Sequence, residues 1–403
     1  MDTRQAIQEA DRYARDKGYH CLFPRCTKQA VRCHSVQRAT CIAALANYGK
    51  IYTVHQSYSQ FIKNRTGQEP MRIVKEGVNR ASTFNGFCGE HDTMLFARAE
   101  GPDREKRVNG MPTAFHLRAI SLEYCRQRRT ADFLRKQGEL TDDQILKGVS
   151  NEHAAAIEAK IAIFKKLYIG SVFAILFGSK IDAITSCRYR FARNLRVSCC
   201  GCFAQTNSKF DSVIGFNLIS YTDGAFLVFT TFKAVEHYLR NFIALTGPGT
   251  AGIEELVNEV AFSKCEEPLI APTFWEELTE DERRHVGLSL RPPAFRSGLP
   301  TPRIIRLGPN DVLEHEEPPV SISFGKDGKG KVLKFKRLPT GEFQVLESEE
   351  IQLDYKGEPN KATMLAAIES VRPDLRGRIR FGSNKLAKGE EGIASTESDT
   401  RTP

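Results

Sequence analysis

The chain has 403 residues, of which 41% are hydrophobic and 27% are charged, and its net charge is +9. This mixture is typical of a protein with a packed core and excludes a disordered or collagen-like chain. The longest mainly apolar run, residues 167–178, is shorter than the roughly 20 residues that a membrane-spanning helix needs. We therefore expect a buried helix there and no contact with a membrane.

The chain has eleven cysteines, an odd number that is too sparse for a disulfide scaffold. Its polar first residues do not resemble an export signal. We therefore expect a cytoplasmic protein in which clustered Cys and His side chains bind metal rather than form disulfides.

Charge is distributed unevenly along the chain. Residues 1–200 carry a net charge of +14 and residues 201–403 carry −5. A basic half is typical of a protein that contacts a polyanion such as DNA or RNA. The alternative is a solvated basic surface without a partner.

In the first half we expect mainly helices, separated by glycine and polar breaks. They are expected at residues 1–18, 35–48, 91–99, 113–136 and 151–178. A short strand is expected at residues 51–55. Residues 58–80 are expected to form a loop, and residues 181–199 a helical or connecting stretch.

The periodicity changes near residue 200. Residues 212–218 and 225–231 are β-rich and are separated by Thr222, Asp223 and Gly224, which predicts a hairpin. Helices are expected at 233–244, 252–262, 275–286 and 360–371, strands at 320–324, 330–337 and 342–346, and a Pro/Gly-rich linker at 288–319. The polar tail from residue 383 is expected to be disordered.

Two short segments have the spacing of metal ligands. Cys21 and Cys26 form a C-x4-C pair with a proline in the turn, and Cys88 and His91 form a C-x2-H pair. Three thiolates and one imidazole make a closed tetrahedral set, which is typical of structural zinc. The alternative is four unrelated residues, since free cysteine often fills a core.

His34 follows Cys33 at the end of an expected strand between these pairs. The residues allow three interpretations: Cys33 or His34 replaces a zinc ligand, His34 performs chemistry, or His34 only braces the zinc loop through hydrogen bonds.

The order of these motifs resembles the treble-clef, ββα-metal family of HNH endonucleases. The resemblance implies that Cys21, Cys26, Cys88 and His91 bind zinc, and that His34 is the general base that activates water. It implies further that Asp92 binds the catalytic Mg²⁺ or Mn²⁺, and hard cations do prefer such oxygen ligands. Residues 81–92 and 272–278 also resemble a group of uncharacterised bacterial proteins with HNH-like zinc heads.

The sequence departs from the HNH pattern at several positions. Cys33 stands where these nucleases usually have Asp, Glu or His, and thiolate is a poor ligand for Mg²⁺. The middle Asn of the motif has no clear counterpart, and the gap between His34 and Cys88 is long. The alternative function is a non-catalytic, zinc-stabilised module that binds nucleic acid or protein. A third is an adaptor whose acidic second half docks a partner protein.

Two further motifs allow a functional and a structural interpretation. Cys199, Cys200 and Cys202 are expected to lie in a buried strand or turn rather than in a second metal site. The arginines at 126–129 and 188–196 are expected either to contact phosphates or to form a solvated helix face.

Taken together, the sequence predicts an α+β fold with five parts. They are a treble-clef zinc head (1–100), a basic helical region (101–200), a mixed α/β module (201–290), a small β-rich unit (291–382) and a tail (383–403). The predicted function is metal-dependent, HNH-like cleavage of nucleic acid.

Overall fold

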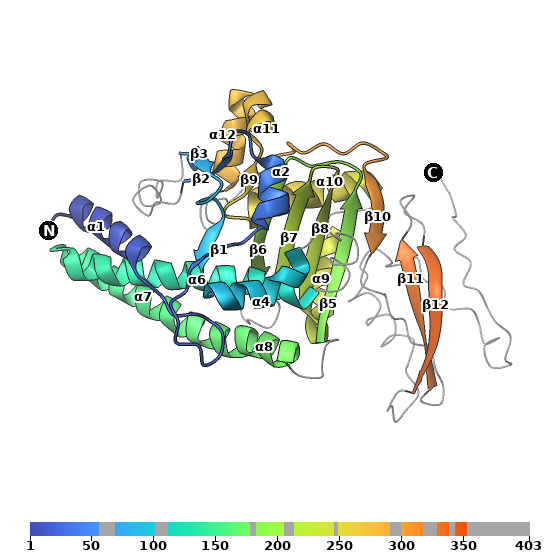
Figure 1. Cartoon of the computed structure of the whole chain (residues 1–403), viewed down its shortest axis with the longest axis horizontal. Helices are drawn as coiled ribbons and strands as arrows, with labels where there is room; N and C mark the ends of the chain where they lie inside the picture. Colours follow the sequence, from blue (N-terminus) through green and yellow to red (C-terminus); the bar gives the residue numbers. More distant parts are fainter. Residues whose placement is uncertain are drawn as a thin grey trace, which may run out of the picture.

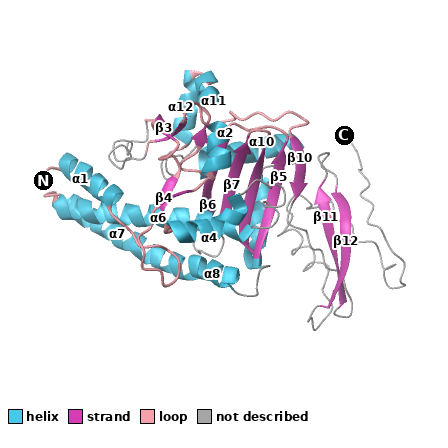
Figure 2. Cartoon of the chain, viewed as in Figure 1, coloured by secondary structure: helices cyan, strands magenta, loops and turns pink. Residues whose placement is uncertain are grey.

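A computed structural model describes residues 1–55, 69–100, 112–177, 183–204, 213–245, 249–290, 300–316, 329–337 and 343–352. Within these residues the fold is mixed α+β, as predicted. Its centre is one large antiparallel sheet, with helices packed against it (Figure 1, Figure 2).

Eight strands form this central sheet, and every neighbouring pair is antiparallel. They are β2 (Lys50–Val54), β3 (Ile73–Gly77), β5 (Ile184–Phe191), β6 (Val197–Ala204), β7 (Val213–Tyr221), β8 (Gly224–Phe232), β9 (Leu269–Ile270) and β10 (Val312–Glu316). Their order across the sheet is β10-β5-β8-β7-β6-β9-β2-β3. Ile270 of β9 pairs with both Tyr52 and Val197, so this two-residue strand joins the N-terminal strands to the rest.

The sheet is covered on both faces. The central strand β7 is buried at every position, as expected of a strand with cover on both sides. Helix α6 (Pro112–Leu140) contacts strands β5 to β8 on one face. The second hydrophobic cluster, on the other face, includes side chains of α9 (Glu236–Leu245), α10 (Gly249–Glu259) and η7 (Val260–Lys264).

The predicted hairpin after residue 200 is confirmed. Strands β7 and β8 pair from Gly215 with Thr230 to Tyr221 with Gly224. Thr222 and Asp223 therefore form a two-residue connection, the length favoured in hairpins.

The helical or connecting stretch expected at 181–199 is wrong, because it holds β5 and the start of β6. The four arginines suggested a helix face. Instead, the most deeply buried side chains recur at every second residue: Cys187, Tyr189 and Phe191 are at most 1% exposed, which is the period of two that characterises a strand.

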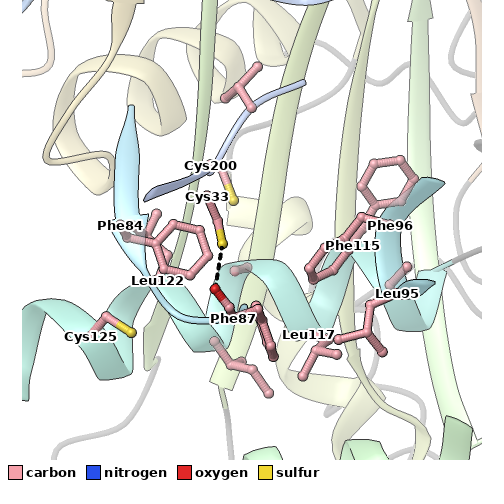
Figure 3. Close-up of a cluster of buried hydrophobic side chains, with 14 of the residues drawn as sticks. Cys33, Phe84, Phe87, Leu95, Phe96, Phe115, Leu117, Leu122, Cys125 and Cys200 are labelled. Carbon is pink, nitrogen blue, oxygen red and sulfur yellow. Dashed lines mark hydrogen bonds between the residues drawn. The ribbon is translucent and has the colours of Figure 1, made fainter. Parts of the chain in front are cut away.

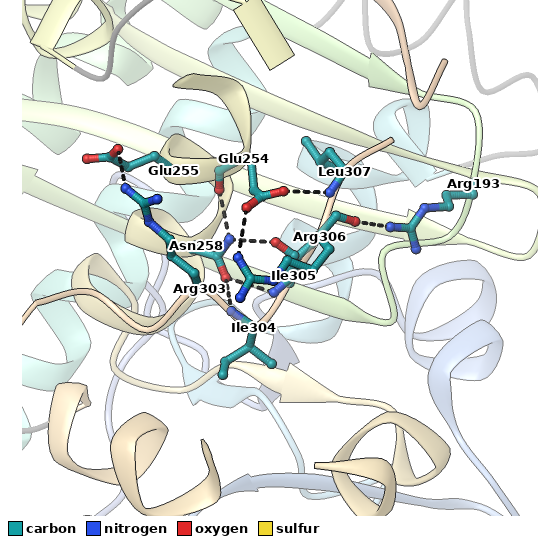
Figure 4. Close-up of polar contacts among 9 residues, drawn as sticks. All are labelled: Arg193, Glu254, Glu255, Asn258, Arg303, Ile304, Ile305, Arg306 and Leu307. Carbon is teal, nitrogen blue, oxygen red and sulfur yellow. Dashed lines mark hydrogen bonds and ion pairs between the residues drawn. The ribbon is translucent and has the colours of Figure 1, made fainter. Parts of the chain in front are cut away.

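The linker expected at 288–319 is also wrong in part. Val312–Glu316 is strand β10, which pairs with β5. Before it, residues 300–311 form an extended segment, here called the strap, which lies against α10 (Figure 4). Side chains of α10 accept the strap's backbone hydrogen bonds, a tertiary contact that Pro and Gly content does not reveal. Residues 291–299 and 317–319 lie outside the described residues.

The two long helices of the first half are confirmed. Helix α6 ends at Leu140, and α7 (Gln144–Phe164) is followed directly by η3 (Lys165–Ile169) and α8 (Gly170–Phe177). Asp143 caps α7 by accepting from the backbone N–H groups of Ile145 and Leu146, as N-cap side chains do. Within the described residues, no helix is long and apolar enough to cross a membrane.

The N-terminal part contains a small two-stranded sheet. Strands β1 (Arg32–His34) and β4 (Thr83–Asn85) pair antiparallel, and α4 (Gly89–Glu100) follows. The chain between β1 and β4 contains η1 (Arg38–Ile42), α2 (Ala43–Leu45), β2 and β3. The helix and strand expected near residues 38–54 are confirmed. The loop expected at 58–80 is wrong at β3, whose backbone pairs with β2.

Other predicted elements have mixed outcomes. Five expected helices are confirmed. Those at 1–18 and 91–99 are α1 (Thr3–Asp16) and α4. Those at 233–244, 252–262 and 275–286 are η6 (Lys233–Val235) with α9, α10 with η7, and α11 (Pro272–Glu277) with α12 (Glu280–Ser289). Strands β11 (Lys329–Arg337) and β12 (Phe343–Gln352) pair antiparallel, as expected for a meander. The strand at 320–324, the helix at 360–371 and the tail lie outside the described residues. The division into five parts stays a prediction.

Candidate metal centre

The first thiol pair lies in a tight turn between α1 and β1. The backbone N–H of Cys21 donates to Lys28 O at 2.9 Å, and that of Cys26 donates to Phe23 O at 3.1 Å. Arg25 has a φ of 63°, in the left-handed region that tight turns use. The folded-back turn holds both thiols on one side.

The second ligand pair lies where β4 ends and α4 begins. Cys88 precedes the helix, and His91 is in its first turn. The backbone N–H of Leu22 donates to Gly86 O at 2.8 Å. This bond joins the turn that carries the first pair directly to the segment that carries the second.

The four predicted ligands come together. The ligand atoms of Cys21, Cys26, Cys88 and His91 all lie within 4.8 Å of one another. His91 Nδ1 is 3.5 Å from Cys21 Sγ and 3.2 Å from Cys88 Sγ. The ring of Phe23 stacks on the imidazole, with centroids 3.8 Å apart and planes 6° apart. This Cys₃His group could hold a metal ion such as zinc.

The thiols of Cys21 and Cys88 have opposite shifts in pKa. Burial raises the pKa of Cys21 to about 11, whereas the backbone N–H of His91 lowers the pKa of Cys88. Metal ligation requires thiolates. The ion would therefore supply the positive charge that Cys21 needs to lose its proton.

His34 lies at the end of β1, in the small two-stranded sheet. It pairs with Thr83 of β4, and its Nδ1 is 3.2 Å from Ala81 O. A carbonyl oxygen only accepts hydrogen bonds, so Nδ1 must be the donor. In the neutral ring the lone pair then lies on Nε2, which is the atom that could accept a proton.

Cys33 and Asp92 lie close together between β1 and α4. Cys33 is 1% exposed, and its thiol donates to Phe87 O at 3.4 Å, among buried aromatic side chains (Figure 3). Burial and the neighbouring Asp92 carboxylate raise the pKa of Cys33 well above its ordinary value. The structure thus brings Asp92 to Cys33, the residue before the predicted base.

Several of the arginines that suggested a phosphate site make contacts within the chain. Arg126 forms an ion pair with Glu267 at 3.3 Å, and each side chain is only 11% exposed. The guanidinium of Arg128 lies 3.8 Å from the ring centroid of Tyr19. Arg188 of β5 is buried. Arg126 and Arg128 thus hold elements together, and Arg188 is buried in a strand, so these three side chains do not form a solvated helix face.

The strand predicted around the Cys199 cluster is confirmed. Cys199 and Cys200 are buried in β6, at 0% and 2% exposure. Among the described residues, the only potential metal group is the one around His91. The cysteines of β6 therefore act as core residues.

The sequence interpretation did not include Phe23 in the site. Phe23 lies between Cys21 and Cys26 in the same turn, and this position in the sequence could have indicated that its side chain lies close to the Cys₃His group, as the stacking on His91 shows. Phe23 also contacts Phe173 and Phe177 of α8 edge-on, so it connects the metal centre to the helix that follows α7.

Comparison with known proteins finds no match. No family model, no curated protein and no solved structure matches the chain. The functional proposal therefore depends on the Cys₃His group and on the hydrogen bond of His34.

Proposed function

We propose that Cys21, Cys26, Cys88 and His91 bind one structural zinc ion. A tetrahedral ion with Zn–S of about 2.3 Å and Zn–N of about 2.0 Å separates its ligand atoms by roughly 3.5 Å. The distances of 3.2 and 3.5 Å to His91 Nδ1 suit this arrangement. With zinc bound, the turn, β1, β4 and α4 would make a treble-clef unit of the ββα-metal kind.

On this unit we propose metal-dependent cleavage of a nucleic acid, with His34 as the general base. The observation that carries the proposal is the hydrogen bond from His34 Nδ1 to Ala81 O at 3.2 Å. It orients the ring and leaves the lone pair on Nε2, which would take a proton from the attacking water. The ordinary pKa of histidine, about 6.5, suits this role near neutral pH.

Asp92 would supply a carboxylate oxygen to a catalytic Mg²⁺ or Mn²⁺. It lies in the first turn of α4, one residue after the zinc ligand His91, so the zinc would fix its position. The positive charge of residues 1–200 would favour contact with the phosphodiester backbone of DNA or RNA.

A cleavage assay on single- and double-stranded DNA and RNA, with Mg²⁺ or Mn²⁺, tests this function. We expect wild type to cleave one of these substrates. His34→Ala should lose at least about 100-fold in rate, the usual contribution of general-base catalysis, and Asp92→Asn should also lose activity because it weakens binding of the catalytic ion. His153→Ala, an exposed histidine on α7, is the matched control and should cleave normally. Full activity in His34→Ala would contradict the proposed base.

One observation favours the second candidate, a zinc-stabilised binding module without catalysis. Cys33 is 1% exposed and its thiol is held by Phe87 O, so the position beside Asp92 belongs to the core. Elemental analysis and a filter-binding assay distinguish the two functions. One zinc per chain, binding of nucleic acid and no cleavage with either ion would support the binding module.

A further inference from the structure

Helix α7 has an outer side that no described element covers. The helix packs on α6, where Ser150 donates to Gln137, and Figure 1 shows the two helices side by side. The buried residues of α7 are Ser150, Ala154 and Phe164. Two isoleucines lie away from this contact: Ile145 is 81% exposed and Ile163 is 46% exposed. A contiguous exposed surface with apolar side chains marks a candidate interface, whereas single exposed residues do not.

These isoleucines belong to an aligned row, here called the outer stripe. At 100° per residue, the row falls within about 80° of the helix circumference. It consists of Ile145, Val149, Glu152, Ala156, Lys160 and Ile163. All six side chains are exposed to solvent, and Val149, at 39%, is the least exposed of the three large apolar ones. Along the helix, the row has apolar residues at both ends, one charged residue of each sign inside them, and the small residue Ala156 at its centre.

The outer stripe is complementary to itself when one copy is reversed. Val149 and Ile163 are each seven positions from Ala156, and Glu152 and Lys160 are each four positions from it. A two-fold axis opposite Ala156 therefore sets Val149 against Ile163 of a second copy. The same axis sets Glu152 against Lys160 of the second copy, and by symmetry this pair occurs twice in the interface.

The small residues of α7 permit close approach at the centre of such a pair. Ala156 lies on the axis, and Ala159 beside it is also exposed. Within the described residues, neither Glu152 nor Lys160 has an ion pair in its own chain. They are about 12 Å apart along the helix, too far to pair with each other.

We propose that α7 joins two copies of this chain as an antiparallel helix pair, with the two-fold axis opposite Ala156. A two-fold interface is isologous, so each residue meets the counterpart that the symmetry assigns. Apolar pairs at the ends exclude water, and the Glu152–Lys160 pairs set the direction and the register. This assembly is independent of the proposed nuclease function.

Sedimentation of the full chain tests the centre of the interface. We expect wild type to sediment as a dimer and Ala156→Glu as a monomer, because two carboxylates would meet on the axis. The dissociation constant should rise by at least about tenfold, since like charges in contact are strongly unfavourable. Ala162→Glu is the matched control: the same exposed residue type on the same helix, about 120° from Ala156, should stay dimeric.

Charge reversal tests the register. Glu152→Lys should weaken the dimer by at least about tenfold, because it sets lysine against Lys160 of the second copy. The double variant Glu152→Lys with Lys160→Glu should restore the wild-type constant. Circular dichroism of each variant checks that the fold is kept.

Three results would overturn the proposal. The first is a wild-type chain that stays monomeric up to about 100 μM, a concentration that corresponds to weak affinity. The second is an equal effect of Ala156→Glu and Ala162→Glu. The third is a double charge reversal that does not restore the dimer.

Discussion

Glu123 lies in α6 where that helix meets the segment after η7. Gln127 donates to it at 2.8 Å, and the ion pair between Arg126 and Glu267 lies beside it. Burial, followed by the charge of Glu266, raises the pKa of Glu123 to about 7. The folded state therefore holds a proton on Glu123 at pH values where the unfolded chain has lost it.

This raised pKa predicts a loss of stability with increasing pH. Glu123 stabilises the fold fully below its ordinary value of 4.5, and this contribution is lost as the pH rises to about 7. Glu123→Gln should match wild type near pH 4 and exceed it by about 1–3 kcal/mol at pH 8, measured by urea unfolding at both values. Glu158→Gln removes an exposed carboxylate paired with Arg135 and should show no such pH-dependent difference.

The difference between variants is needed because His116 acts in the opposite direction. Burial lowers the pKa of His116 to about 4, so this residue destabilises the fold as the pH falls from 6.5 to 4. The wild-type profile contains both effects. A Glu123→Gln profile parallel to that of wild type would contradict the role of Glu123.

The Cys₃His group could be predicted from the sequence because each of its two pairs is local. A C-x4-C turn and a C-x2-H helix start fix their side chains within a few residues. The contact between Cys33 and Asp92 could not be predicted, because it depends on how α4 packs against β1. For the same reason, nothing in the local sequence marks Glu123 as different from the other polar residues of α6.

At the scale of elements, the strap is held by side chains of α10, and one of them, Asn258, makes three of the hydrogen bonds. Asn258 is fully buried. Its Oδ1 accepts from the backbone N–H groups of Ile304 and Ile305 at 2.9 Å, and its Nδ2 donates to Ile305 O at 2.8 Å (Figure 4). The Asn258 side-chain amide thus makes the hydrogen bonds to Ile304 and Ile305 that a neighbouring strand would otherwise make.

Asn258→Ala should destabilise the protein by about 2–3 kcal/mol, because it leaves buried backbone groups of Ile304 and Ile305 without their partner. Urea unfolding measures the loss, and hydrogen exchange should show faster exchange of these two amides. Glu255→Gln breaks only the exposed ion pair with Arg303 and should cost less than about 1 kcal/mol. Unchanged exchange in Asn258→Ala would show that the strap is held elsewhere.

Which elements could be predicted depended on whether their signal was local. The β7–β8 hairpin has its turn residues and both strands in one stretch of sequence. By contrast, β9 has two residues and exists only because Ile270 lies between Tyr52 and Val197. The strap has no helical or strand periodicity of apolar residues. Its backbone hydrogen bonds to α10 depend on tertiary contact, which the local sequence does not reveal.

At the scale of the whole molecule, the metal centre and the central sheet are connected through one segment. The chain leaves β1 at His34, forms β2 and β3 at the edge of the sheet, and returns at Thr83 to β4. The α+β class could be predicted from the alternation of patterns. The assembly of one sheet from residues 50 to 316 could not, because its pairings are far apart in sequence.

Loss of the metal should therefore destabilise more than the ligand turn. Cys26→Ser should abolish binding of one ion per chain and lower stability by several kcal/mol, as structural zinc contributes to folding directly. Elemental analysis and thermal unfolding measure both effects. Cys125→Ser alters a buried thiol that bonds Asn85 O outside the ligand group and should keep its ion. A Cys26→Ser protein with a full metal content would disprove the ligand assignment.

The long segment between the two ligand pairs also bears on the order of synthesis. About 60 residues separate Cys26 from Cys88, and closing a loop of that length costs about 4 kcal/mol of chain entropy. A growing chain has all four residues of the Cys₃His group, and β3 beside β2, once His91 has left the ribosome. Strand β2 acquires its other neighbour, β9, only when Ile270 emerges. The ion would thus close this loop early and hold β2 and β3 in place while the strands they later join are still being translated.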